Sequence, residues 1–353
     1  MKRITEFLER KNVTISLKRY GVDALGAMAQ GLFASLLIGT ILSTLGTQLN
    51  FKLFNDIGAF ASGVKGPAMA ISIAYALQSP PLVMFSLAAV GFAADSLGGA
   101  GGPLAVLVVS IIASELGKIV SKETKVDILV TPLVTIISGC LLSQWWAPYI
   151  GSAASSVGNA IMWATDLQPF LMGILVSVIV GIALTLPISS AAICAALSLT
   201  GLAGGAAVAG CCAQMVGFAV MSFKENRWSG LVAQGVGTSM LQMGNIVRKP
   251  LIWLPPIITS AITGPLATCV FKLQMNGPAV SSGMGTCGFV GQIGIYTGWL
   301  NDIQNGLKAS VTAFDWISLI LVSFVLPAAI TWVIGHFFRK AGWIAENDLK
   351  LDV

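Results

Sequence analysis

The residues of this chain that could do chemistry gather in four glycine-rich, polar stretches within an otherwise apolar sequence. The stretches cover 94–103, 201–210, 233–245 and 276–294. Their carboxamides and hydroxyls donate and accept hydrogen bonds, and their glycines let backbone amides approach a ligand closely. This chemistry suits a neutral solute that carries hydroxyl or amide groups. The predicted solute-binding residues are Asp95, Gly98, Gly99, Asn245, Asn276, Ser281, Ser282, Thr286 and Gln292.

These stretches also carry a structural expectation. Irregular polar backbone at membrane depth persists only inside protein or beside a water-filled cavity, so we expect the glycine-rich segments to surround a cavity. The alternative is helix packing, in which small residues only permit two helices to approach each other. This alternative is favoured for 201–210.

Ionisable groups in apolar segments also indicate candidate functional positions, because each is energetically costly in a membrane unless it is paired or hydrated. Asp95 is either a functional carboxylate or a helix cap at the membrane surface. Asp56 and Lys65 are nine residues apart, about 13 Å along a helix, and are expected at different depths or with other partners. Glu115 precedes Lys118 by three residues, which predicts a local ion pair at the surface.

No catalytic constellation is visible. The sequence has no Walker loop, no HExxH and no GxSxG, and its single histidine, His336, excludes most histidine-dependent sites. The six cysteines lack metal-type spacing. We therefore predict no catalytic residues, no metal site and no cofactor, and leave enzyme activity open.

The composition requires membrane helices to position these residues. Hydrophobic residues make up 55% of the 353 residues and charged residues 10%, whereas soluble domains carry about 25% charged residues. Because a crossing needs about 20 apolar residues, we predict an all-α polytopic membrane protein with about ten transmembrane helices. The predicted crossings are 24–48, 57–77, 80–96, 103–120, 126–148, 168–186, 188–203, 206–223, 250–271 and 314–337.

The basic residues predict the orientation. An even number of crossings puts both termini on one side, and that side holds 16 of the 20 Lys and Arg residues. It is therefore cytoplasmic, in the cell's inner membrane. Because the net charge of +5 sits at helix ends and in loops, no nucleic-acid partner is predicted.

The chain divides into three parts. Residues 1–22 form a basic arm whose Ile4, Phe7 and Leu8 have helical spacing, which suits either an amphipathic helix on an anionic leaflet or a solvated arm. Residues 23–338 form the transmembrane domain, and 339–353 a cytoplasmic tail.

An internal repeat is predicted within the transmembrane domain. Placing Pro80 over Pro187 aligns two diverged units, at about 57–148 and 168–271. A re-entrant glycine-rich segment follows at about 276–300, and the last helix spans 314–337. The connection 149–166 is predicted to be an interfacial helix.

Three strings carry a family resemblance: GGAGGPLAVLV (98–108), GNIVRKPLIWLPPIITSAITGPL (244–266) and NGPAVSSGMGTCGFVGQIG (276–294). The chain resembles the phosphotransferase-system IIC-like membrane proteins, in the group that includes the perfringolysin O regulator. The resemblance implies a ten-helix IIC domain, a homodimer and inward passage of a sugar-like solute. It also implies separate IIA and IIB partner proteins and a pathway lined by 276–292, with Asn245, Pro255 and Pro256 shaping a broken helix nearby.

The chain departs from that family in two respects. It carries no IIA or IIB domain, and it lacks the Gly-Ile-Thr-Glu motif of glucose-type members; its Ile-Thr-Glu stands at residues 4–6, in the arm. The leading hypothesis is a IIC-type permease, at most the membrane component of a sugar phosphotransferase system. The alternatives are an ion-coupled secondary transporter that depends on Asp95, and a membrane-bound sensor or regulator that acts through the arm and the 224–249 loop.

Overall fold

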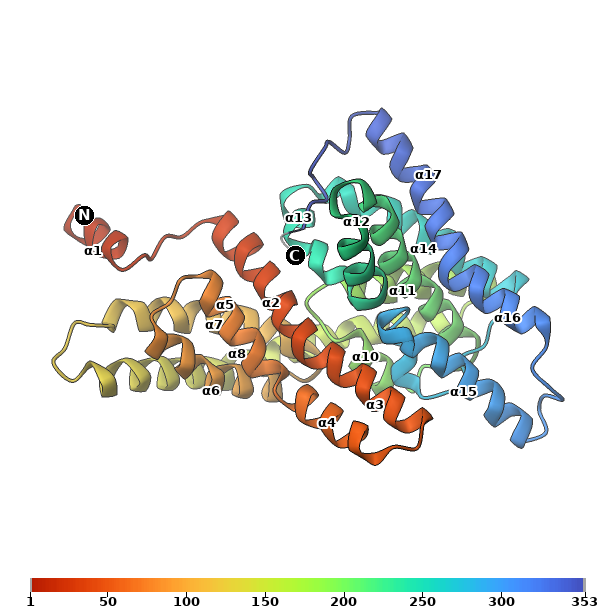
Figure 1. The fold of residues 1–353 in the computed structure, drawn as a ribbon, viewed down its shortest axis with the longest axis horizontal. Helices are drawn as coiled ribbons and strands as arrows, with labels where there is room; N and C mark the ends of the chain where they lie inside the picture. Colours follow the sequence, from red (N-terminus) through yellow and green to blue (C-terminus); the bar gives the residue numbers. More distant parts are fainter. Residues whose placement is uncertain (1, 352–353) are drawn as a thin grey trace. The chain divides into compact units, whose positions relative to one another are not determined.

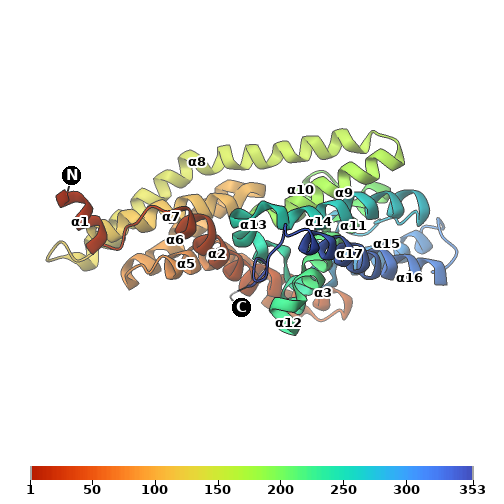
Figure 2. The ribbon, with the colours of Figure 1, turned by 90° about the horizontal axis from the view of Figure 1, so that it is seen from above.

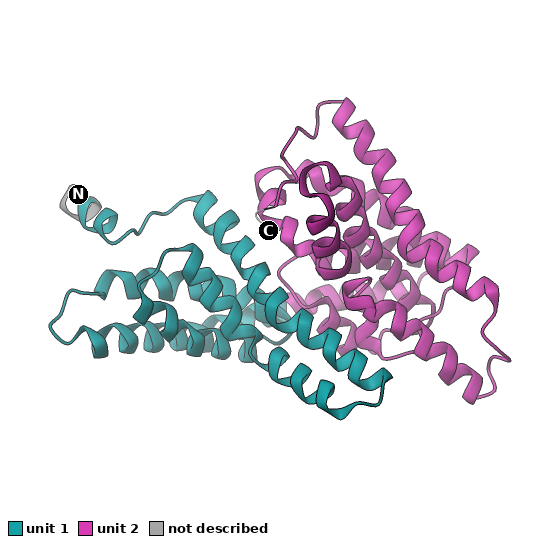
Figure 3. Ribbon diagram, in the orientation of Figure 1, with its two compact units in different colours: residues 1–153 teal, residues 154–353 magenta. Residues whose placement is uncertain are grey.

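The computed structural model describes residues 2–351, with side chains from Glu6 onward, so Ile4 of the predicted arm lies outside the described side chains. All regular elements among these residues are helical, and the protein is a polytopic membrane protein by composition and helix length. The chain forms two compact units, Met1–Ala153 and Ala154–Val353, coloured separately in Figure 3.

Unit 1 contains α1 to α7 and most of α8 (Figure 1). Two π-helical turns, η1 (Arg19–Asp23) and η2 (Phe33–Leu37), continue α2 and α3 into one helical run over Arg19–Gln48. The bounds are α1 (Lys2–Arg10), α2 (Ala24–Leu32), α3 (Ile38–Gln48), α4 (Lys52–Gly63), α5 (Lys65–Ala76), α6 (Pro81–Gly98), η3 (Gly99–Gly101), α7 (Gly102–Val120) and α8 (Asp127–Thr165).

Glycines set the spacing of helices in unit 1. A Cβ atom at Gly58 of α4 would lie 2.6 Å from the carbonyl oxygen of Gly39 in α3. A Cβ atom at Gly66 of α5 would lie 2.5 Å from the carbonyl oxygen of Gly91 in α6. The backbones therefore touch directly, which is the close packing that small residues permit in membrane helices.

The run Pro81–Val120 is a helical hairpin, because α6 and α7 fold back on each other at η3. Ser79 Oγ lies 2.6 Å from Ser114 Oγ, although 35 residues separate them, and Gly117 lies beside Val83. A straight 40-residue helix would place these groups about 50 Å apart. Gly99, at the turn, has a φ of 51°, which glycine adopts without strain.

Unit 2 is built around α11, which is almost completely buried. Its elements are α9 (Pro169–Thr185), α10 (Ser190–Ala196), α11 (Gly201–Met221), α12 (Phe223–Val232), η4 (Ala233–Gly237), η5 (Ser239–Gln242), α13 (Met243–Arg248), η6 (Pro250–Trp253), α14 (Leu254–Pro265), η7 (Leu266–Val270), η8 (Ala279–Gly283), η9 (Cys287–Phe289), α15 (Val290–Gln304), α16 (Ala313–Ile320), η10 (Leu321–Val325) and α17 (Leu326–Lys340).

Six helical runs in residues 2–351 are long and apolar enough to cross a membrane, and seven if α4 and α5, bent by 47°, form one broken span. The predicted count of ten is not confirmed. The expected crossing at 188–203 contains only the seven-residue α10, about 10 Å long, which is too short to span about 30 Å of hydrocarbon.

The interfacial helix expected at 149–166 is also not a separate element. Figure 2 shows α8 as one long helix through this region, and it contains Pro132 and Pro148 without a break. The boundary between the units lies between the two predicted repeat segments, but the repeat itself stays a prediction.

Candidate functional site

A buried cluster of uncharged polar side chains surrounds Gln214 in the middle of α11. Gln214 Oε1 accepts hydrogen bonds from Trp253 Nε1 at 2.9 Å and Thr185 Oγ1 at 3.3 Å, and Gln214 Nε2 donates to Ser260 Oγ at 3.4 Å. Thr185 Oγ1 also lies 2.8 Å from Ser239 Oγ. The cluster, called the Gln214 cluster below, therefore joins α9, α11, η5, η6 and α14.

The sequence analysis missed Gln214, Thr185, Ser239, Ser260 and Trp253 as site residues. One signal could have found them: Gln214 is the sole carboxamide in the otherwise apolar stretch 201–221. A buried carboxamide is costly unless it is hydrogen-bonded, so it predicts polar partners on neighbouring elements.

The irregular segment between η7 and α15 packs directly on α11. Gly201 and Met275 exchange two backbone hydrogen bonds of 2.9 Å. A Cβ atom at Gly205 would overlap the carbonyl oxygen of Leu273. The glycines of 201–210 thus serve close packing, which is the alternative that the sequence favoured for this stretch.

Several predicted residues of this segment are buried with partners on α11 or on the loop before it. Ser282 Oγ donates to the carbonyl oxygen of Leu199 at 2.6 Å. Thr286 Oγ1 lies 3.6 Å from Met215 Sδ. Ser281 is buried beside Gly294 of α15. Residues 281–288 are buried, and the backbone of 276–289 contains the short 3-10 helices η8 and η9 but no α-helix; its re-entrance from one membrane face stays a prediction.

Gln292 has a different environment. Its Nε2 donates to Cys212 Sγ at 3.4 Å, but its buried Oε1 has no hydrogen-bond partner among the described residues. Ser323 Oγ of η10 approaches Cys212 as well and also lacks a hydrogen bond of normal geometry there. Two oxygens are thus left unpaired next to Cys212, which lies two residues, about half a turn of α11, before Gln214.

Asn276 and Asn245 are separate from this part of unit 2. Asn276 Nδ2 donates to Asp302 Oδ2 of α15 at 2.8 Å. Asn245 Nδ2 donates to Gln242 Oε1 at 2.9 Å and to the carbonyl oxygen of Lys350 at 2.8 Å. Asn245 therefore binds the tail of the chain in this structure, a contact that the sequence did not predict.

The remaining three predicted residues lie in unit 1. Asp95 Oδ1 is 3.3 Å from Lys65 Nζ, so the partner of Lys65 is Asp95. Gly98 is buried against Ala105, and Gly99 forms the hairpin turn with open space around its Cα. Lys65 begins α5 at the bend after α4, so the ion pair joins a broken helix to the end of α6.

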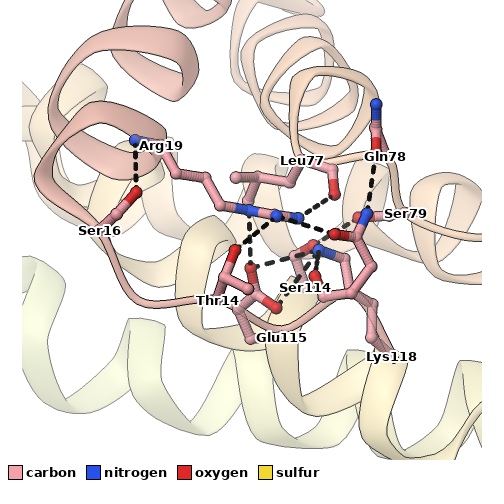
Figure 4. A network of polar contacts seen from close by, with 10 residues as sticks. Thr14, Ser16, Arg19, Leu77, Gln78, Ser79, Ser114, Glu115 and Lys118 are labelled. Carbon is pink, nitrogen blue, oxygen red and sulfur yellow. Dashed lines mark hydrogen bonds and ion pairs between the residues drawn. The ribbon is translucent and has the colours of Figure 1, made fainter. Parts of the chain in front are cut away.

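A second polar network in unit 1 fixes the N-terminal arm (Figure 4). Lys118 Nζ lies 3.2 Å from Glu115 Oε1, so the predicted pair forms, but it is buried rather than at the surface as predicted. Arg19 Nε approaches the same carboxylate at 3.7 Å, and Arg19 Nη2 donates to the carbonyl oxygen of Leu77 at 2.6 Å. The Lys118 ammonium also donates to the carbonyl oxygen of Asn12, so the arm is tied to the ends of α5 and α7.

Two hollows are described on the units. One, of about 440 Å³, lies between the arm and the turns of unit 1, and its lining includes Arg10, Lys11, Lys118 and Lys122. The other, of about 360 Å³, is an apolar hollow along α14 and η7. None of the nine predicted site residues lines either hollow.

The family model described as "Phosphotransferase system, EIIC" matches residues 22–351, nearly the whole chain. No curated protein and no solved structure is significantly similar to the chain. The match covers both units and includes the three strings that carry the resemblance. The chain therefore belongs to the phosphotransferase system EIIC family and is a multi-pass membrane protein of the permease type.

Proposed function

We propose that this protein carries a sugar or sugar-like neutral solute across the cell membrane and that unit 2 supplies its binding site. The observation that carries the proposal is the set of buried, uncharged hydrogen-bonding groups along α11, from Cys212 and Gln292 to the Gln214 cluster. Sugar hydroxyls donate and accept hydrogen bonds, as carboxamides and hydroxyls do. A neutral solute would exchange partners here without bringing a charge into hydrocarbon.

The unpaired oxygens of Gln292 and Ser323 support this assignment. A buried acceptor without a partner costs about 1–3 kcal/mol. A solute hydroxyl that donates to Gln292 Oε1 and accepts from Ser323 Oγ would recover that cost for each of them. Conformations that open this part of unit 2 are therefore expected to bind hydroxylated solutes at Gln292 and Ser323.

Binding of a sugar panel by the purified protein in nanodiscs tests the proposal. Gln292→Met keeps the shape and removes the carboxamide, and Ser323→Ala removes the hydroxyl. We expect each variant to weaken the Kd of a bound sugar by about 5- to 150-fold, the equivalent of about 1–3 kcal/mol. Unchanged affinity in both variants, or no binding of any sugar by the wild type, would reject the site.

Ser110→Ala is the matched control. Ser110 Oγ in α7 is also buried and also lacks a hydrogen-bond partner among the described residues, but it lies in unit 1. Loss of a buried hydroxyl from this position should leave sugar affinity unchanged. An equal loss at Ser110 would show that the effect is a general loss of stability.

The proposal extends to the assembly. We infer that separate IIA and IIB proteins supply the phosphoryl group, that the chain is a homodimer, and that both termini are cytoplasmic in an inner membrane. The chain itself would then contribute binding and translocation, with the phosphoryl transfer done by its partners. A thiol reagent that does not cross membranes, applied to Thr124→Cys in intact cells and compared with the wild type, tests the orientation, because Thr124 is exposed in the same loop: labelling from outside would reject it.

Ion-coupled transport is the second candidate, and the ion pair of Lys65 with Asp95 in unit 1 favours it. An ionisable pair inside apolar helices is expensive and is often functional. In liposomes, this candidate predicts uptake driven by a proton or sodium gradient and abolished in Asp95→Asn. Uptake that needs only the phosphoryl donor would exclude it.

A further inference from the structure

Residues 344–351 lie in a groove of unit 2 that is formed by three carboxamide side chains and one lysine. The groove, called the amide groove below, consists of Asn226, Gln242, Asn245 and Lys249. Figure 1 shows the C-terminal end beside α12 and α13, which carry Asn226 and Asn245. The occupying segment is 344–351, and its Ile344, Leu349 and Leu351 are buried.

The carboxamides of the groove bind the main chain of the segment. Asn226 Nδ2 donates to the carbonyl oxygen of Leu349 at 2.7 Å, and Asn226 Oδ1 accepts from the amide of Leu351 at 2.8 Å. Gln242 Nε2 also donates to the Leu349 carbonyl, at 3.0 Å, and Asn245 Nδ2 donates to the Lys350 carbonyl. The segment is folded as a turn at 346–349, in which Asn347 has a φ of 68°, and the carboxamides bind it through its backbone while Leu349 and Leu351 are buried.

A charged contact fixes the register of the segment. Lys249 Nζ lies 2.6 Å from Asp348 Oδ2, and both side chains are partly buried. The ion pair of Lys224 with Glu346 is largely exposed, so it contributes little. Asp348 is therefore the carboxylate that positions the peptide.

The groove is continuous with the interior of unit 2. Gln242 Nε2 donates to Gln234 Oε1 at 2.9 Å, and Gln234 in turn donates to Ser222 Oγ at 2.8 Å. Gln242 ends η5, whose first residue, Ser239, bonds to Thr185 of the Gln214 cluster. Segment 233–245 therefore carries both Gln242, which binds the C-terminal segment, and Ser239, which contacts the Gln214 cluster.

We propose that the amide groove is a peptide-binding site whose ligand is the chain's own segment 344–351, and that release of this segment frees 233–245 from the Gln214 cluster. The bound segment closes the loop over the cluster, and the released segment opens it to water.

Hydrogen exchange of the full-length protein in nanodiscs tests the proposal without a solute. Asp348→Lys places a second cation next to Lys249 and should release the segment. Hydrogen exchange of 233–245 should then rise by at least tenfold, and exchange at Thr185 should rise as well. Combining it with Lys249→Asp restores the pair with reversed charges and should restore protection. Glu346→Lys, at the exposed pair, is the matched control and should leave exchange unchanged.

A synthetic peptide of sequence IAENDLKL, copied from 344–351, gives the second arm. Added to the Asp348→Lys variant, it should bind and restore the protection of 233–245, whereas a scrambled peptide should not. Absence of peptide binding would overturn the site. Binding or release that leaves exchange of 233–245 unchanged would overturn the link to the loop. Neither result depends on whether the protein transports sugars.

Discussion

Glu115 is the single carboxylate between two cations, and this arrangement makes an asymmetric prediction. Lys118 is 1% exposed, and the side chains of Glu115 and Arg19 are 12% and 15% exposed. Glu115→Gln removes the counter-charge of both cations. Lys118→Met instead leaves a balanced pair of Glu115 with Arg19. The carboxylate should therefore matter more than either cation to the stability of unit 1.

The expected magnitudes follow from burial. Removing one partner of a buried pair costs about 3–5 kcal/mol, because the charge left behind is uncompensated. Losing the Lys118 hydrogen bond to the carbonyl of Asn12 costs about 1–3 kcal/mol. A cooperative unit of this size shifts by about 2–4 °C per kcal/mol. We expect Glu115→Gln to lower the melting temperature of unit 1 by about 6–20 °C, and Lys118→Met by a smaller amount, about 2–12 °C.

Thermal unfolding in detergent, monitored by the hydrogen exchange of residues 12–30 and 105–120, measures the loss of stability within unit 1. Glu123→Gln is the control, since Glu123 is more exposed and its pair with Arg10 lies at the same end of the unit. A melting temperature that falls as far in Lys118→Met as in Glu115→Gln would refute the reasoning. It would show that the two cations do not share one carboxylate.

The remaining predictions concern other contacts. A hydrogen bond from Lys11 lowers the pKa of Glu123 in the folded protein. The pair therefore stabilises the arm at any pH above the pKa of Glu123 in the unfolded chain, and this stability is lost as the pH falls through the folded-state pKa. Hydrogen exchange of residues 6–14 should rise only below about pH 4. Gly205→Ala should prevent folding, which a loss of monodisperse protein yield would show. Gly26→Ala should leave the yield unchanged, because a Cβ atom at Gly26 would have no neighbouring atom within 4 Å. Asp95→Asn should cost about 3–5 kcal/mol of unfolding free energy in denaturant titrations, and much of this should return when the paired lysine is also neutralised.

The family and the membrane location could be predicted from short strings and from composition, because neither depends on which helices touch. The Glu115 pair with Lys118 could be predicted for a similar reason: residues three apart share a helix face wherever the helix lies. The helix count could not. Apolar runs do not show where a chain folds back inside a membrane, and α10 is short because the chain turns within its apolar run.

The predicted site shows the same division. Ser282, Thr286 and Gln292 were predicted to bind a solute; the structure shows them buried, and solute binding stays a prediction. Their partners were not identified, because α11 is apolar except at Gln214 and its sequence does not show which face meets which neighbour.

The sequence by itself determined that this protein is embedded in a membrane, that its backbone is helical and which family it belongs to. These properties follow from hydropathy, from glycine and proline content and from local strings. Only the tertiary structure decided that Asn245 binds the tail, across 105 residues, and that Gln292 reaches Cys212, across 80. The physical reason is that a hydrogen bond between distant residues requires two backbones to approach within a few ångströms. That approach is set by the packing of the whole unit around α11.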